Sequence, residues 1–351
     1  MREMKAWVLH DIGAIHLEEA DRPEPAENEV LVAVKAAGIC GSDIPRIYQN
    51  GAYSHPLILG HEFSGEVVET GVLADPVWKG QRVGVFPLIP CRECAPCRQK
   101  QFEMCRNYSY LGSRRDGGFT EYVAVPEENL IPLPENVTFE AAAMLEPMAV
   151  VVHAMRRIKA KPSDRIAICG VGTIGLLLYL FLREAGMSNI FVFGNKEFQK
   201  HTLTRLGLPE DFYCDIRGND VDRWLKERTD GEGVDVFFEC VGRNDTLVQA
   251  LNQAAFSGRI MLIGNPFGDV HLEKSVYWKI LRNQMTVKGS WNSTFVHEPS
   301  DDWHYVMKRL EEGRIVPSEL ITHRFALKDL GQGFHIMRDK TEDYVKIMCT
   351  F

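Results

Sequence analysis

Hydrophobic and polar residues follow a strand-like pattern in the first part of the chain. Short β-rich runs at 6–9 and 29–34 are separated by a turn rich in proline and glutamate at 21–25. This pattern is typical of antiparallel strands joined by turns. More β-rich segments follow up to Val125, and the composition becomes helical over 139–144. We therefore predict a mainly-β region that ends near residue 150.

The pattern changes past residue 160. A short apolar run at 165–169 precedes a segment, 173–186, that is apolar on nearly every side of a helix. Helix-length segments then separate further strand-like runs, at 190–193, 234–239, 259–264 and 285–287. Strands that alternate with helices predict a parallel, doubly wound sheet covered on both faces, which is the Rossmann architecture.

The last part of the chain returns to the first pattern. After Ser290 we expect a helix near 302–312 and strands near 320–325 and 344–349. The predicted fold class is α/β, with a mainly-β domain at 1–150, a doubly wound domain at 151–290 and a return to the first domain over 291–351. A chain of 351 residues is long enough for two such cores.

Composition narrows the class of protein. Hydrophobic residues make up 45% and charged residues 25%, as in ordinary soluble proteins, and the longest apolar run, 174–182, is too short to cross a membrane. The net charge of −8 argues against a nucleic-acid partner. The first residues contain no apolar signal region, and single cysteines are scattered outside the cluster described next. We therefore expect a protein of the reducing cytoplasm.

Four of the nine cysteines fall within residues 91–105, spaced C-x2-C-x2-C-x7-C: Cys91, Cys94, Cys97 and Cys105. Short spacings of this kind let successive thiolates face one zinc ion, so we predict a closed, structural zinc lobe. Disulfides, an iron–sulfur cluster and ordinary thiols are the alternatives. Disulfides need a secreted context, and no other context for a cluster is visible. Because the four cysteines would occupy all four coordination positions of the zinc ion, this site would have no position for a substrate.

A glycine-rich turn opens the helix of the second domain. It reads Cys169-Gly-Val-Gly-Thr-Ile-Gly175 and lies between a predicted strand and a predicted helix. Such glycines allow a tight turn and bring a pyrophosphate close to free N–H groups. We expect a dinucleotide here, bound by Gly170, Gly172, Thr173, Ile174, Gly175, Gly194, Asn195, Lys196 and Gly264.

The second strand of this domain ends without the acid that binds the ribose of NAD. The chain reads Gly194-Asn195-Lys196 at this point. Without a carboxylate, a 2′-phosphate is not repelled, and Lys196 could pair with it. We therefore expect NADP rather than NAD. If Lys196 is a solvated loop lysine, either cofactor would bind.

A second metal site can be assembled from Cys40, His61 and Glu146, which are far apart in the sequence. A catalytic zinc needs three protein ligands and one open position, and these residue types are suitable. Taken singly, a cysteine or a histidine is more often a structural residue, so spacing alone leaves this site open.

Five motifs together resemble the zinc-dependent medium-chain alcohol and polyol dehydrogenases. They are residues 38–43 (Gly-Ile-Cys-Gly-Ser-Asp), 60–62 (Gly-His-Glu), the cysteine lobe, 145–147 (Leu-Glu-Pro) and the glycine-rich turn. The resemblance extends over essentially the whole chain. Segments 45–52, 111–119 and 279–282 look most like sugar-alcohol-phosphate dehydrogenases, the galactitol-1-phosphate 5-dehydrogenases among them.

The resemblance implies a GroES-like catalytic domain, two zinc ions per chain, NADP or NAD, and a homodimer or homotetramer. Cys40, His61 and Glu146 match the catalytic zinc ligands, and Glu62 is a competing ligand. Ser42 matches the hydroxyl that relays a proton, although it could equally bond to local backbone.

Three arginines are candidates for binding a substrate phosphate: Arg46, Arg114 and Arg115. Guanidinium groups bind phosphate bidentately, whereas surface pairing with acids would explain the same residues. Adjacent residues of an extended segment point to opposite faces, so we expect one of Arg114 and Arg115 to reach the ligand.

The predicted function is hydride transfer between NAD(P) and a sugar alcohol phosphate. The alternatives are an unphosphorylated polyol such as sorbitol as substrate, a quinone reductase that lacks the catalytic zinc, and a non-catalytic nucleotide-sensing protein.

Overall fold

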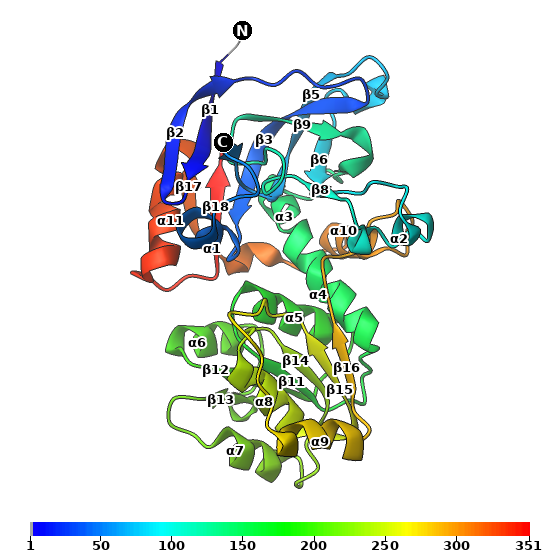
Figure 1. Ribbon diagram of the computed structural model, residues 1–351, viewed down its shortest axis with the longest axis vertical. Coiled ribbons are helices and arrows are strands. Elements are labelled where there is room, and N and C mark those ends of the chain that lie inside the picture. Colours follow the sequence, from blue (N-terminus) through cyan, green and yellow to red (C-terminus); the bar gives the residue numbers. More distant parts are fainter. Residues whose placement is uncertain (1–2) are drawn as a thin grey trace. The chain divides into compact units, whose positions relative to one another are not determined.

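The protein, described here by a computed structural model over residues 3–351, divides into two compact units (Figure 1). Unit 1 comprises residues 3–147 and Ser293–Phe351, and unit 2 comprises Met148–Asn292. Unit 1 is mainly β, and unit 2 has a parallel sheet with helices. The α/β fold class that the sequence predicted is confirmed. Residues 1–2 of the predicted first domain lie outside the described residues.

Unit 1 is built around a mixed sheet in which strands run in the order β10-β6-β5-β3-β18-β17, with β9 also paired to β3. These strands are β3 (Glu29–Ile39), β5 (Glu62–Thr70), β6 (Arg82–Val85), β9 (Tyr122–Pro126), β10 (Leu130–Pro132), β17 (Ile321–Ala326) and β18 (Lys346–Thr350). The C-terminal strand β18 runs antiparallel to β3, with Ile347 opposite Ile39. Residues from both ends of the chain therefore share one sheet.

Two small sheets and several short helices complete unit 1. The order β2-β1-β4 joins β1 (Glu3–Asp11), β2 (Ala14–Asp21) and β4 (Leu57–Ile58), and β7 (Leu88–Ile89) pairs with β8 (Ser109–Tyr110). The helices are α1 (Asp43–Pro45), α2 (Ala95–Arg98), α3 (Phe139–Ala143), α10 (Asp302–Glu311) and α11 (Leu330–Asp339), and α4 (Leu145–Ile158) begins here.

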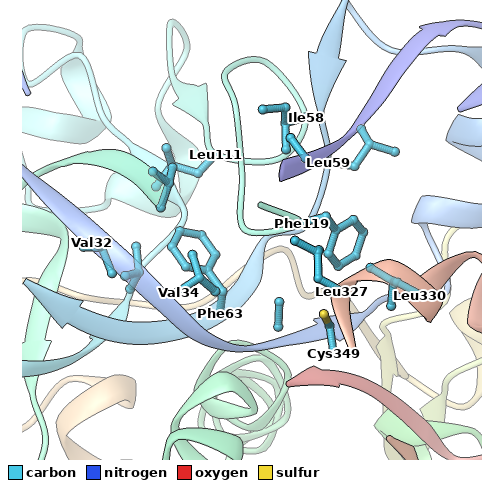
Figure 2. Packing of buried hydrophobic residues seen from close by; sticks show 14 of the residues in the cluster. Val32, Val34, Ile58, Leu59, Phe63, Leu111, Phe119, Leu327, Leu330 and Cys349 are labelled. Atoms are coloured by element: carbon cyan, nitrogen blue, oxygen red, sulfur yellow. The ribbon is translucent and has the colours of Figure 1, made fainter. Parts of the chain in front are cut away.

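The core of unit 1 lies against β3. Apolar side chains from distant segments meet there, including Val34, Phe63, Phe119 and Leu330 (Figure 2). Phe119 is fully buried and packs against Phe334 of α11 with ring centroids 5.5 Å apart. Truncating such a core phenylalanine to alanine costs about 3–5 kcal/mol. This packing fixes the loops at the end of β3.

Unit 2 is a six-stranded parallel sheet with the order β13-β12-β11-β14-β15-β16. Its strands are β11 (Ile166–Cys169), β12 (Ile190–Gly194), β13 (Tyr213–Asp215), β14 (Val234–Glu239), β15 (Ala254–Leu262) and β16 (Thr286–Gly289). Its helices include α5 (Thr173–Glu184), α6 (Glu197–Arg205), α7 (Val221–Arg228), α8 (Asn244–Gln253) and α9 (Lys274–Arg282). The strand order reverses at β11, and ligands of such sheets bind beyond the carboxyl end of the strands at this point.

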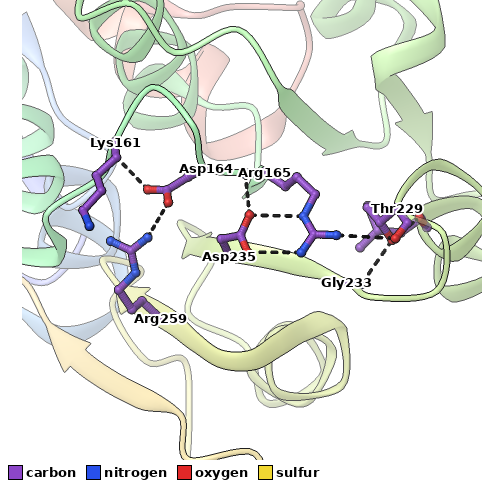
Figure 3. Close-up of polar contacts among 8 residues, drawn as sticks. Lys161, Asp164, Arg165, Thr229, Gly233, Asp235 and Arg259 are labelled. Carbon is purple, nitrogen blue, oxygen red and sulfur yellow. Dashed lines mark hydrogen bonds and ion pairs between the residues drawn. The ribbon is translucent and has the colours of Figure 1, made fainter.

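A polar network at the amino ends of these strands stabilises unit 2 (Figure 3). Arg165, just before β11, binds the carboxylate of Asp235 in β14 through Nε and Nη2, each at 3.1 Å. A second pair joins Arg259 of β15 to Asp164, with 2.6 Å between Nη2 and Oδ1. These pairs lie at the opposite ends of the strands from the glycine-rich turn, so they hold the sheet together at its amino-terminal edge.

No helix within residues 3–351 is long and apolar enough to cross a membrane.

Candidate functional site

A predicted metal-ligating pair is positioned by the register of β3 and β5. Cys40 directly follows β3, His61 directly precedes β5, and the strands pair antiparallel with Gly38 opposite Glu62. Gly60 has φ +94°, and the ring of Phe119 occupies the space that a side chain at residue 60 would need. Only glycine therefore allows the turn that presents His61.

Three potential ligands meet at this point. Ligand atoms of Cys40, His61 and Glu62 lie within 4.8 Å of one another. The Ser42 hydroxyl, predicted to relay a proton, donates a hydrogen bond to Cys40 Sγ at 3.3 Å. A thiol, an imidazole and a carboxylate gathered around one point are a suitable donor set for zinc.

Asp43 organises the residues around this cluster. Its buried carboxylate accepts a hydrogen bond from the Cys40 amide at 2.9 Å, and its Oδ1 lies 3.3 Å from Arg46 Nη1 and 3.5 Å from His61 Nδ1. Burial alone would raise the pKa of Asp43, but His61, Arg46 and the Cys40 amide lower it further than burial raises it. Asp43 therefore stays ionised and can orient the imidazole, as acids behind metal-bound histidines do.

Glu146, the fourth predicted residue, lies close to the same cluster. It is the second residue of α4, it is buried, and its Oε1 accepts a hydrogen bond from the Tyr110 hydroxyl at 3.2 Å. The Tyr110 ring also packs edge-on against His61, with centroids 5.8 Å apart. Burial and the neighbouring Glu62 raise the pKa of Glu146 to about 7, against the opposing effects of His61 and Lys346.

The charges of this cluster suit a bound cation. Burial lowers the pKa of His61, but Asp43 and Cys40 raise it well above its usual value. A zinc ion would supply positive charge beside these groups and displace the protons of its ligands, and the residues present fit the group.

The four-cysteine lobe has the geometry of a tetrahedral thiolate site. It lies in the connection from β7 to β8, and its cysteines are not joined by disulfides. The Sγ separations are 3.4 Å for Cys94–Cys97, 3.9 Å for Cys94–Cys105 and 4.0 Å for Cys91–Cys97. Four thiolates about 2.3 Å from one zinc ion would stand about 3.8 Å apart. The lobe therefore fits zinc, as the spacing predicted.

The glycine-rich turn has the form that a pyrophosphate needs. Gly170 has φ +101°, and a side chain on Gly175 would overlap the Gly170 carbonyl oxygen. Nothing lies within 4 Å of the space that a side chain on Gly172 would occupy, so the backbone is open to a ligand there. Thr173 begins α5 directly after this turn, and the first amide groups of a helix attract phosphate.

Gly194 is the last residue of β12, the position at which NAD-binding domains have an acidic residue that binds the ribose. A Cβ at this position would lie 2.5 Å from Tyr213 Oη, and that hydroxyl donates a hydrogen bond to the Lys196 carbonyl oxygen at 3.2 Å. Tyr213 thus fills the space that an aspartate would need. Of the other predicted cofactor residues, Asn195 is exposed, and Gly264 packs so tightly against the backbone of Val241 and Gly242 that it tolerates no side chain.

The structure separates the three arginines predicted to bind phosphate. Arg46 contacts Asp43, and Arg115 pairs with Glu29 at 2.5 Å, at the start of β3 and thus at the opposite end from Cys40. The Arg114 guanidinium lies over the rings of Tyr53 and Tyr108, 4.0 Å and 4.6 Å from their centroids.

Arg114 is linked to the metal cluster through aromatic rings. Tyr108 packs edge-on against Tyr110, with centroids 6.3 Å apart, and Tyr110 contacts His61. Arg114 is exposed, and among the residues described its guanidinium contacts the two tyrosine rings and forms no ion pair. Its N–H groups can donate to an anion.

Three residues of the site were missed by the sequence analysis. Asp43 lies in a predicted motif but its type and spacing indicate no role, and Tyr110 carries no signal of its own. Lys346 could have been found, because a lysine that opens the apolar run Lys346–Thr350 implies a buried partner. Its partner is Glu62, which lies 284 residues away in the sequence.

The fold and these two sites define a zinc-dependent dehydrogenase. Residues 26–135 match the alcohol dehydrogenase GroES-like domain, and residues 173–312 match the zinc-binding dehydrogenase family. The chain belongs to the zinc-dependent medium-chain alcohol and polyol dehydrogenases. It is therefore an oxidoreductase that acts on a CH–OH group with a nicotinamide cofactor.

Relatives with named activities differ in substrate. The chain is 31% identical to galactitol 1-phosphate 5-dehydrogenase of Escherichia coli K12, over 94% of this chain and 95% of the relative. It is 28% identical to L-galactonate-5-dehydrogenase of the same organism, over the full length of both, and 29% identical to sorbitol dehydrogenase of Halalkalibacterium halodurans, over 99% of both.

Solved structures of similar proteins share the whole fold. Galactitol-1-phosphate dehydrogenase from Escherichia coli has a TM-score of 0.92 at 29% identity, covering 99% of this chain and all of that one. A Sinorhizobium meliloti protein solved with NADP has a TM-score of 0.91 at 28% identity over both full lengths. An Escherichia coli alcohol dehydrogenase solved with NADH has a TM-score of 0.91 at 25% identity, covering 99% of both chains. Relatives thus use both forms of the cofactor.

Proposed function

We propose that this protein oxidises a secondary alcohol of a sugar alcohol phosphate, such as galactitol 1-phosphate or a pentitol phosphate, and reduces the ketone in the reverse direction, with NADP preferred to NAD. The observation that carries the substrate class is Arg114, held between Tyr53 and Tyr108 without a carboxylate partner among the described residues. The relative that acts on galactitol 1-phosphate supports the same class.

The residues around the metal cluster would have different roles in the reaction. Cys40, His61 and one glutamate would hold a zinc ion, which when bound acts as a Lewis acid toward the alcohol oxygen. Asp43 orients His61, and Tyr110 positions Glu146 through its hydroxyl. Ser42, hydrogen-bonded to Cys40 Sγ, would carry the alcohol proton away from the cluster.

Arg114 would set the distance between the phosphate and the reacting carbon. Its ring contacts fix the guanidinium plane, and a fixed guanidinium binds phosphate through two parallel hydrogen bonds. An unphosphorylated polyol such as sorbitol is the second candidate substrate, and the sorbitol dehydrogenase relative supports it.

The preference for NADP rests on Gly194 and its neighbour Tyr213. With Tyr213 Oη 2.5 Å from the position of a Cβ, residue 194 has no room for the carboxylate that would select NAD. Lys196 follows two residues later and would interact with a 2′-phosphate. The protein would form a homodimer or homotetramer, as the family resemblance implies, and light scattering measures its mass in solution.

Replacing Arg114 tests the substrate class. Arg114→Ala should raise KM for a polyol phosphate about 10- to 100-fold, because it removes one pair of charge-assisted hydrogen bonds. KM for the unphosphorylated polyol should stay within about twofold of the wild-type value. Arg115→Ala is the matched control, because its partner is Glu29, and should change neither value. Equal effects of Arg114→Ala on both substrates would show that this arginine binds no phosphate.

A further inference from the structure

Glu239 is a buried carboxylate at the carboxyl end of the sheet of unit 2. It is the last residue of β14, it is 3% exposed, and it lies in register with Cys169, the last residue of β11. Its Oε1 accepts hydrogen bonds of 2.8 Å from the amides of Val241 and Gly242 and from the Thr246 hydroxyl. These donors replace the water that a buried carboxylate would otherwise need.

The turn held by these bonds, residues 240–242, packs against the glycine-rich turn. The Cys240 amide donates a hydrogen bond to the Cys169 carbonyl oxygen at 2.9 Å. A Cβ on Gly170 would lie 2.7 Å from a methyl group of Val241, so a side chain at residue 170 would collide with this turn. A shift of turn 240–242 would therefore disturb the place at which a dinucleotide lies on such a sheet.

The same turn packs on its other side against the loop that follows β15. The amides of Ile263 and Gly264 donate hydrogen bonds to the Glu239 carbonyl oxygen, at 2.9 Å and 3.0 Å. A side chain on Gly242 would overlap the Asn265 carbonyl oxygen. The turn thus has close backbone neighbours on both sides, and the Glu239 carboxylate fixes its amides between them.

The order of the strands relates this turn to the nicotinamide half of the cofactor. In a doubly wound sheet, the adenosine ribose lies at the strand after the glycine-rich turn, here β12, and the pyrophosphate lies at the turn itself. Strand β14 pairs with β11 on the side opposite to β12. A dinucleotide that crosses the carboxyl end of the sheet from β12 to β14 brings its nicotinamide half to turn 240–242.

We propose that Glu239 is a positioning residue for the nicotinamide half of the cofactor. Its carboxylate acts through turn 240–242, by holding two consecutive amides, and not through a contact with the reacting atoms. Hydrogen bonds to a charged acceptor are stronger than those between neutral groups, so one carboxylate is enough to fix the turn. The inference concerns the cofactor and does not depend on which alcohol is oxidised.

Two ligands separate this role from a general loss of structure. They are NADP⁺ and adenosine 2′,5′-bisphosphate, which lacks the nicotinamide half. Glu239→Leu removes the acceptor of three hydrogen bonds, so Kd for NADP⁺ should rise about 10- to 100-fold. Kd for the bisphosphate should not change, and titration calorimetry measures both values. NAD⁺ and ADP form the equivalent pair if the protein binds NAD⁺ more tightly.

A conservative variant and a control accompany this substitution. Glu239→Gln keeps an oxygen that accepts from both amides, so it should bind NADP⁺ nearly as tightly as the wild-type protein does. Asp235→Asn is the matched control, because Asp235 is an acid near the amino end of the same strand, where it pairs with Arg165. It should lower the stability of unit 2 and change neither Kd.

Thr246→Val provides a second route if Glu239→Leu does not fold. It removes one of the three donors and keeps the size of the side chain, so Kd for NADP⁺ should rise about 3- to 10-fold, again with no change for the bisphosphate. The proposal is overturned if the folded variants bind NADP⁺ as the wild-type protein does, or if they bind both ligands equally less tightly. It is also overturned if Asp235→Asn weakens NADP⁺ to the same extent, because a loss of stability alone would then explain the effect.

Discussion

At the scale of single residues, Asp43 joins three other residues of the candidate active site. Its carboxylate interacts with the Cys40 amide, the Arg46 guanidinium and His61 Nδ1. A group that holds both the Cys40 backbone and the His61 imidazole determines how well the site is prepared for a metal. Its importance comes from position, which the sequence alone does not give.

Asp43→Asn should weaken binding of the catalytic metal. The amide keeps the size of the side chain but removes the charge that orients His61, so zinc affinity and kcat/KM should each fall about 10- to 100-fold. Metal content after dialysis against a chelator measures the affinity, and the cysteine lobe serves as an internal control. Asp339→Asn, which removes an exposed pair with Arg338, should have no effect. An unchanged zinc affinity would contradict this role.

Several residues of the candidate site could be predicted from the sequence, but the residues that they contact could not. Cys40 and His61 were predicted through the resemblance of their motifs to the family, and the structure places their ligand atoms within 4.8 Å of each other. Arg115 could not be separated from Arg114, since the choice depends on Glu29, which lies 86 residues away. Tyr110 contacts both His61 and Glu146 only because β8 follows the cysteine lobe and pairs with β7.

At the scale of elements, periodicity located most strands and helices. The predicted helix at 173–186 is observed as Thr173–Glu184, and the predicted strand at 320–325 as Ile321–Ala326. Strand β3 continues to Ile39, beyond the predicted run 29–34, because β5 and β18 pair with its second half. Tertiary pairing of this kind leaves no local pattern. The short strands β4, β7 and β8 are likewise defined by their partners.

The pair between Arg165 and Asp235 should stabilise unit 2 in a pH-dependent way. Burial raises the pKa of Asp235, but hydrogen bonds and charge from Arg165 lower it overall. A carboxyl whose pKa is lowered on folding contributes stability above its unfolded pKa and loses it as the pH falls through the folded pKa.

Asp235→Asn should therefore lower the free energy of unfolding by about 1–2 kcal/mol at pH 7, as for the loss of charged hydrogen bonds that are partly exposed. The difference from the wild-type protein should shrink as the pH drops below about 4. Urea unfolding of both proteins at several pH values measures it. A difference that persists unchanged at pH 3 would mean that the side chain acts through packing alone.

At the scale of the whole molecule, the cysteine lobe precedes the segment that carries Arg114. It spans the connection between β7 and β8, and Tyr108, Tyr110 and Arg114 follow it directly in the chain. Lys100 of the lobe also pairs with Glu298, with 2.6 Å between Nζ and Oε1. A metal in the lobe would therefore fix the residues that we propose to bind the phosphate.

Cys97→Ser should remove one zinc ion per chain and lower Tm by at least about 5 °C, because binding of a structural metal contributes directly to folding. It should also raise KM for the polyol phosphate more than for the free polyol. Metal analysis and thermal unfolding measure the first effects, and steady-state rates the last. Full zinc content in this variant would show that the lobe is not a four-thiolate site.

One comparison of substrates tests the proposed substrate class most directly. Initial rates should be measured for galactitol 1-phosphate and galactitol, each with NADP⁺ and with NAD⁺. We predict that the phosphate raises kcat/KM about 10- to 100-fold, and that NADP⁺ is the better cofactor. Equal rates with both polyols, or a preference for galactitol, would contradict the proposed role of Arg114 and the substrate class with it.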